Sequence, residues 1–222
     1  MRKIAFAICS SSILMLALGT AASASTVTVQ LTSAGSVTSN DHSVYVGPYQ
    51  LTVNGDAISA DCDDYFDRIS VGQTWQANVV PLTAAGISSA LFGGEPNADQ
   101  LYLEAAYLDS LFGNHPTSQY NDIQYAIWGL FDSDALSSSN YDAGAAAFRS
   151  QADLADLSFS QFQGWEILVP ASNLQFNVAD SRPQEFLYKS STPEPASLAL
   201  LGTGLLALGW IGRRKLAPRS QA

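Results

Sequence analysis

A glutamine in a predicted helix and a single upstream cysteine are the residues of this chain best suited to chemistry. Gln124 lies in the stretch NDIQYAIWGLF, residues 121–131, where apolar residues recur at helical spacing on both sides of it. A buried amide there has two interpretations: backbone groups satisfy it, or it faces a reactive partner. Cys62 is the candidate partner, because the other cysteine, Cys9, lies in the N-terminal leader. The pair would allow nucleophilic chemistry between a thiol and a carboxamide.

The sequences around these two residues carry a family resemblance. IQYAIW around Gln124, with the lone cysteine of SADCDDYFD, resembles the thioester domains of bacterial adhesins. The resemblance implies that Cys62 attacks the Gln124 carboxamide carbon, expels ammonia and leaves an internal thioester. An amine on a surface or matrix molecule would then attack this bond and become tethered through an amide. Because the bond is used once, no enzyme activity is expected. The family often has an aromatic residue before its cysteine, where this chain has Asp61.

Other roles for Cys62 stay open at this point. A free cysteine is commonly a buried core residue, and a lone cysteine in an exported protein can also pair between molecules. A Cys–His hydrolase would need His42 or His115, the two histidines of the chain, close to Cys62. No cysteine-protease signature surrounds Cys62. His115 is either an exposed loop residue or a group that assists proton transfer during thioester formation.

An acidic run surrounds Cys62. It consists of Asp61, Asp63, Asp64 and Asp67. Negative charge so close to a thiol disfavours the thiolate. Such carboxylates could also bind Ca²⁺, but their spacing fits no EF-hand loop and the glycine of the sharp turn is missing. A solvated acidic loop is therefore the favoured interpretation, and no metal or cofactor site is predicted.

Both ends of the chain have the features of targeting segments. Residues 1–24 combine a basic start, an apolar run and a small-residue cleavage site, as in a secretory signal peptide. Residues 192–222 hold an apolar run at 196–212, predicted to be a transmembrane helix followed by a cytoplasmic tail. The flanking residues are Pro193, Glu194 and Pro195 before the run and Arg213, Arg214 and Lys215 after it. This tail resembles the PEP-CTERM sorting signal, which implies processing by a membrane-bound exosortase.

Residues 25–191 are predicted to form one exported domain. Four of these residues are Lys or Arg and nineteen are Asp or Glu, so their net charge is −15. So acidic a surface argues against nucleic acid as a partner. We therefore expect a protein anchored first in the inner membrane and later found at the cell surface or outside the cell. Its expected role is adhesion or biofilm matrix attachment, and the alternative is a noncovalent structural or carbohydrate-binding matrix protein.

The elements that must position the two residues follow from hydrophobic periodicity. Strands are predicted at 26–31, 43–53, 56–60, 75–80, 165–169, 174–178 and 185–188, and helices at 98–111, 118–131 and 142–155. The segment 43–53 is one strand or two, interrupted at Gly47-Pro48. Asn54-Gly55 predicts a hairpin turn, which places Cys62 at the end of a strand. The expected fold is α+β, an antiparallel sheet or sandwich with a central helical insert, plus the C-terminal transmembrane helix.

Overall fold

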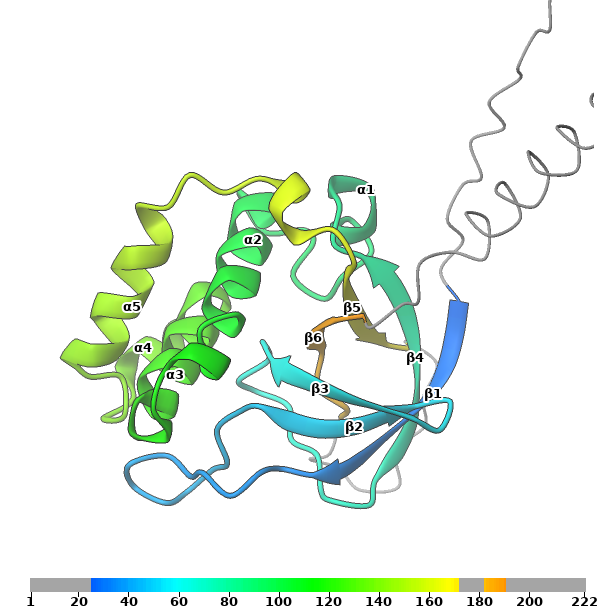
Figure 1. Cartoon of the computed structure of the whole chain (residues 1–222), viewed down its shortest axis with the longest axis horizontal. Coiled ribbons are helices and arrows are strands. Elements are labelled where there is room, and N and C mark those ends of the chain that lie inside the picture. Colours follow the sequence, from blue (N-terminus) through cyan, green and yellow to red (C-terminus); the bar gives the residue numbers. More distant parts are fainter. Residues whose placement is uncertain (1–24, 172–181, 191–222) are drawn as a thin grey trace, which may run out of the picture.

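The computed structural model describes residues 25–171 and 182–190, and its strands form a closed antiparallel barrel (Figure 1). The strand order around the barrel is β1-β2-β3-β6-β5-β4. The strands are β1 (Ser25–Ser33), β2 (Tyr49–Val53), β3 (Asp56–Cys62), β4 (Thr74–Pro81), β5 (Trp165–Pro170) and β6 (Phe186–Lys189). In the described part of the chain, each strand therefore has a neighbour on both sides.

A helical layer lies between β4 and β5 in the sequence and packs beside the barrel (Figure 1). Its α-helices are α1 (Ala84–Ile87), α2 (Ala98–Asp109), α3 (Tyr120–Phe131), α4 (Ser133–Ser137) and α5 (Ala143–Asp153). Three 3₁₀ turns connect them: η1 (Phe112–Asn114), η2 (Thr117–Gln119) and η3 (Phe159–Phe162). The helix of Gln124 is α3, which packs against both α2 and α5.

Most of the predicted elements are confirmed. The hairpin of β2 and β3 turns at Asn54-Gly55, where both residues have positive φ and Val53 pairs with Asp56. Cys62 is the last residue of β3, as predicted. The predicted strand at 43–53 is shorter in the structure, because β2 begins at Tyr49. The predicted strand at 174–178 lies outside the described residues.

The predicted fold class is wrong in its sheet architecture. We expected an antiparallel sheet or sandwich, but β1 pairs with both β2 and β4, and this closes a six-stranded barrel. Alternating hydrophobicity shows that a strand has one buried face, but it does not show whether the first and last strands of a sheet meet. Among the described residues no helix is long and apolar enough to cross a membrane. The transmembrane helix predicted at 196–212 lies outside those residues.

Three apolar clusters result from this arrangement, and the smallest includes Tyr125 and Trp128 of α3. Inward-facing residues from all six strands fill the barrel, among them Val29, Leu51 and Phe186, and Cys62 belongs to this core. A second core lies between the helices and the outer face of the barrel and includes Ile123 and Ile127 of α3. Because α3 is enclosed on nearly all sides, its polar residues must find partners within the protein.

Candidate functional site

Cys62 and Gln124 meet where the end of β3 reaches α3. Both residues are fully buried. The backbone of Cys62 is also held by strand pairing, because β3 pairs with β6 through Cys62 and Phe186. The structure therefore brings together the two residues that the sequence singled out, although 62 positions separate them.

The side chain of Gln124 forms two buried hydrogen bonds with backbone groups. Its Nε2 donates to the carbonyl oxygen of Cys62 at 2.7 Å, and its Oε1 accepts from the Gly47 N–H at 2.9 Å. These opposite partners fix which end of the amide is oxygen and which is nitrogen. The simpler of the two sequence interpretations, a buried amide satisfied by backbone, is thus present, and one of its two partners is the candidate cysteine.

The thiol of Cys62 is buried in an acidic environment. Its Sγ donates to the carbonyl oxygen of Asp64 at 3.1 Å. Burial, followed by the charges of Asp64 and Asp63, raises the thiol pKa well above its usual value, and Trp128 beside the sulfur acts in the opposite direction. At neutral pH the group is therefore a thiol, and attack on Gln124 must depend on proximity within the folded site.

The acidic run is not a solvated loop, contrary to our expectation. Asp61, Asp63 and Asp64 are all buried. Two of them face other carboxyl groups: burial and Asp109 raise the pKa of Asp61, and burial and Glu185 raise the pKa of Asp63. A carboxyl group that keeps its proton can be buried beside another carboxyl without an unpaired charge.

Two carboxyl pairs therefore flank the cysteine. On one side, burial raises the pKa of Asp109, the partner of Asp61, to about 6. On the other side, burial raises the pKa of Glu185 to about 7, while Glu185 accepts hydrogen bonds from the Tyr102 hydroxyl and from the Leu91 N–H. Within residues 25–171 and 182–190, no group of three or more acidic, cysteine or histidine side chains is arranged to hold a metal ion.

Gly47 is a site residue that the sequence analysis did not single out. A Cβ at this position would lie 1.8 Å from Asp61 Oδ1 and 2.8 Å from Gln124 Oε1. Only a residue without a side chain fits, so glycine lets a backbone N–H approach the amide. The donor to Gln124 Oε1 comes from the loop before β2. The Gly47-Pro48 break in the predicted strand was the available signal.

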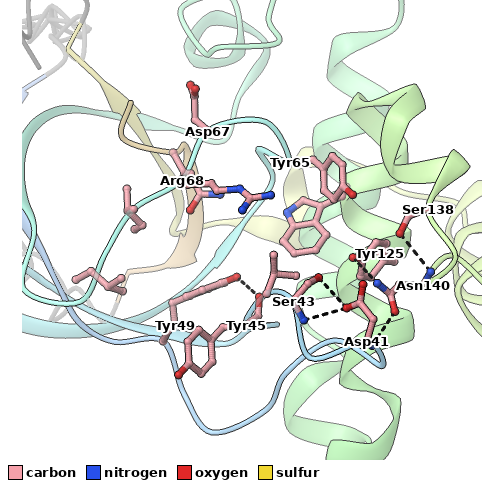
Figure 2. A pocket seen from close by; sticks show the side chains of 16 residues that line it. Asp41, Ser43, Tyr45, Tyr49, Tyr65, Asp67, Arg68, Tyr125, Ser138 and Asn140 are labelled. Carbon is pink, nitrogen blue, oxygen red and sulfur yellow. Dashed lines mark hydrogen bonds between the residues drawn. The ribbon is translucent and has the colours of Figure 1, made fainter. Parts of the chain in front are cut away.

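A cavity of about 230 Å³ opens on the other side of α3 (Figure 2). Aromatic side chains of the loop before β2, of β2, of the loop after β3 and of α3 line it together with polar groups from loops. The aromatic residues are Tyr45, Tyr49, Tyr65, Tyr125 and Trp128, and the charged ones are Asp41, Asp67 and Arg68. Trp128 and Tyr49 line this cavity, and each also interacts with Cys62.

The loop that forms one wall of this cavity is held by side-chain hydrogen bonds. Asp41 accepts from the hydroxyl groups of Ser39 and Ser43, and these bonds lower its pKa, so it is ionised. Asn140 accepts from the Asp41 N–H and donates to the Tyr125 hydroxyl at 3.0 Å, which ties the loop to α3 (Figure 2).

The two histidines take no part in this site. His115 hydrogen-bonds Gln119 and packs edge-on against Phe148, and His42 hydrogen-bonds Thr38. Neither histidine hydrogen-bonds Cys62, so the arrangement of a Cys–His hydrolase is not present in the described structure. The proton-transfer role considered for His115 has no support from these contacts.

Comparison with known families finds the PEP-CTERM protein-sorting motif at residues 191–215. The matched segment contains the Pro-Glu-Pro and Arg-Arg-Lys sequences predicted as its two ends. The chain therefore carries the sorting signal of an exported protein that is held at the membrane before an exosortase processes it. The searches of curated proteins and of solved structures gave no match.

Proposed function

We propose that this exported protein attaches covalently to amine groups on a surface or matrix molecule through a thioester between Cys62 and Gln124. One observation carries the proposal: the two residues are fully buried and in direct contact, with Gln124 Nε2 2.7 Å from the Cys62 carbonyl oxygen. The resemblance of IQYAIW to adhesin thioester domains assigns the same two residues. The sorting signal agrees with a role outside the cell.

The contacts around the amide suit acyl transfer. Because the Gly47 N–H donates to Gln124 Oε1, it polarises the carbonyl group and stabilises negative charge on the oxygen. Because Cys62 and Gln124 are both fully buried, a thioester between them would be shielded from water. A captured amine would remain bonded to Gln124, while Cys62 would return to its thiol form.

Intact mass measurement tests this function. The purified protein should weigh one ammonia less than its processed sequence, and incubation with methylamine should add the mass of one methylamine. The variants Cys62→Ala and Gln124→Ala should show neither change. Since removal of a buried side chain can unfold the protein, circular dichroism of both variants provides the folding control. A folded wild-type protein with its full sequence mass would refute covalent attachment.

A second candidate is noncovalent carbohydrate binding, which the cavity beside α3 favours. Aromatic rings that can pack on a sugar face stand next to polar side chains that can bond its hydroxyl groups (Figure 2). Tyr45 is half exposed and Arg68 is exposed, so both are accessible to a ligand.

The second candidate can be tested without interference from thioester chemistry. Calorimetric titration of the Cys62→Ala protein with dextran fragments and with N-acetylglucosamine oligomers should detect saturable binding. The added changes Tyr45→Ala and Arg68→Ala should each weaken it at least about tenfold, a loss of ~1.4 kcal/mol. Leu154→Ala, at an exposed residue that does not line the cavity, is the matched control.

A further inference from the structure

We propose that a second cavity beside Cys62 and Gln124 binds the primary ammonium group of a lysine-like side chain at the acid pair of Asp61 and Asp109, and that the amine reaches the thioester through this cavity. The inference rests on the proposed thioester and names its substrate class, an alkylamine with a stem of about four carbons. It also separates amine capture from the aromatic cavity considered for carbohydrate.

The second cavity has a volume of about 410 Å³ and adjoins both reactive residues. Asp61, which lines it, directly precedes Cys62 in β3. Tyr120, which also lines it, lies one helical turn before Gln124 in α3. Asp61 Oδ1 and Gln124 Oε1 are near neighbours, because they lie 1.8 Å and 2.8 Å from the one point that a Cβ of Gly47 would occupy. The cavity therefore gives an amine a route to the Gln124 carboxamide from the side of Asp61.

The acid pair that lines this cavity carries one proton and one negative charge. Burial and Asp109 raise the pKa of Asp61 well above its usual value, so Asp61 keeps its proton and donates it to Asp109. Burial raises the pKa of Asp109 to about 6, while the hydrogen bond from Asp61 acts in the opposite direction, so Asp109 is a carboxylate at neutral pH. The charge of this carboxylate therefore favours a cation in the cavity.

Hydrogen bonding at the pair favours an ammonium group in particular. Asp61 is only 2% exposed, yet its Oδ1 has no hydrogen-bond partner among the described residues. Asp109 is partly exposed and lines the cavity. An ammonium group has three N–H donors and a positive charge, so it can bond the carboxylate and the unpartnered oxygen at the same time.

The walls of the cavity suit an alkyl chain. Ile58, Phe112 and Trp165 line it with apolar surface. Lysine carries its ammonium group on a flexible four-carbon stem, which packs along apolar surface while the charged end finds polar partners. Lys189 is the only basic residue among the described residues that line the cavity, and it is exposed, whereas Asp61 is buried. A lysine-length amine therefore matches the cavity, with its stem on the walls and its ammonium group at the acid pair.

The capture step balances with the amine as its only added reactant. An ammonium group at the acid pair gives one proton to the Asp109 carboxylate, and the neutral amine attacks the Gln124 carbonyl carbon of the thioester. The carbon–sulfur bond breaks, an amide bond forms, and a second proton of the amine passes to the sulfur of Cys62, which becomes a thiol again. The proton on Asp109 then passes to solvent.

Amine binding is measured first in Cys62→Ala protein, where no thioester can form. Titration with n-butylamine at neutral pH, followed by ligand-observed NMR, should show saturable binding, and n-butanol should bind at least about tenfold more weakly because it lacks the charge. Asp109→Asn should weaken butylamine binding at least about tenfold, since a hydrogen bond to a charged group is lost. Glu104→Gln is the matched control, because Glu104 is another buried carboxyl group of α2 and bonds Gln100.

The route to the thioester is tested by filling the cavity in the protein that keeps Cys62. Gly113 lines the cavity, and a Cβ there would meet nothing within 4 Å, so Gly113→Trp should narrow the cavity without strain. Gly94→Trp is the matched control, since Gly94 is also exposed and open but does not line the cavity. Mass spectrometry should show butylamine addition slowed at least about tenfold in Gly113→Trp and unchanged in Gly94→Trp, with the ammonia loss complete in both.

The outcomes separate this inference from the proposed function. Folding of every variant is checked by circular dichroism. Folded Cys62→Ala protein that does not bind butylamine, or that binds it equally well with Asp109→Asn, would overturn the inference, and so would wild-type reactivity in Gly113→Trp. Wild-type protein without the ammonia loss would overturn the proposed function and the delivery of the amine to it, whereas amine binding at the acid pair is measured independently of the thioester.

Discussion

Replacement of Gln124 by methionine tests how strongly the amide holds α3 to the barrel. Methionine has a similar length and flexibility but no hydrogen-bonding amide, so the Gly47 N–H and the Cys62 carbonyl would both lose their partner. A buried backbone group left without a partner costs about 1–3 kcal/mol. Loss of both bonds should therefore lower the free energy of unfolding by roughly 2–6 kcal/mol, a large part of the ~5–15 kcal/mol typical of a domain.

The measurement is best made in Cys62→Ala protein, where no thioester can form and add to the difference. Urea unfolding followed by tryptophan fluorescence gives the free energy with and without Gln124→Met. Gln151→Met is the matched control, since Gln151 is exposed on α5 and its substitution should change stability by less than about 0.5 kcal/mol. A Gln124→Met effect as small as that of the control would show that the two buried bonds do not hold α3 in place.

Three further predictions follow from the same region and from α5. Burial raises the folded-state pKa of Glu185 from 4.5 to about 7 and that of Asp109 from 3.8 to about 6, so the stability that these groups contribute at low pH should be lost as pH rises from about 4 to 7. The urea midpoint should fall over this range, and Glu185→Gln should reduce the slope. Gly47→Ala should lower the free energy of unfolding by ~1–3 kcal/mol or more, because its Cβ would overlap Asp61 Oδ1; an unchanged thermal midpoint would contradict this. Asp142→Ala should cost about 0.5–2 kcal/mol in thermal unfolding, because Asp142 caps α5 by accepting from the Gly144 N–H at 2.7 Å.

The order and type of the elements could be predicted from the sequence because the signals are local. Alternation in residues 26–31 and 75–80 and helical spacing in 121–131 each arise within a few residues. Closure of the barrel has no such signal, since β1 pairs with β4 through Val29 and Trp75, which lie far apart in the chain. The helical spacing of residues 121–131 also predicted the buried face of α3. The helix has no side-chain cap at Gln119, and Asn121 accepts from the Asn40 N–H.

The candidate site could likewise be predicted only in part from the sequence. Cys62 and Gln124 could be selected because one is a lone cysteine and the other lies in a motif, and the fold then places them in contact. Burial of Asp61 and Asp63 could not be anticipated from composition, because an acid is expected at the surface unless a partner is known. Their carboxyl partners, Asp109 and Glu185, come from α2 and from the residue before β6, so only the folded chain reveals them.

The position of β6 determines how a mechanical load would enter the domain. This four-residue strand lies between β3 and β5, and the sorting motif begins at residue 191, directly after Ser190. A pull on the anchored end is therefore applied to β6, a strand with antiparallel partners on both sides. Since antiparallel ladder bonds lie perpendicular to the strands, a force along β6 loads the bonds of both ladders together in shear rather than opening them one after another. One of these ladders includes Cys62, so tension on the anchor would be transmitted directly to the strand that bears the candidate thiol.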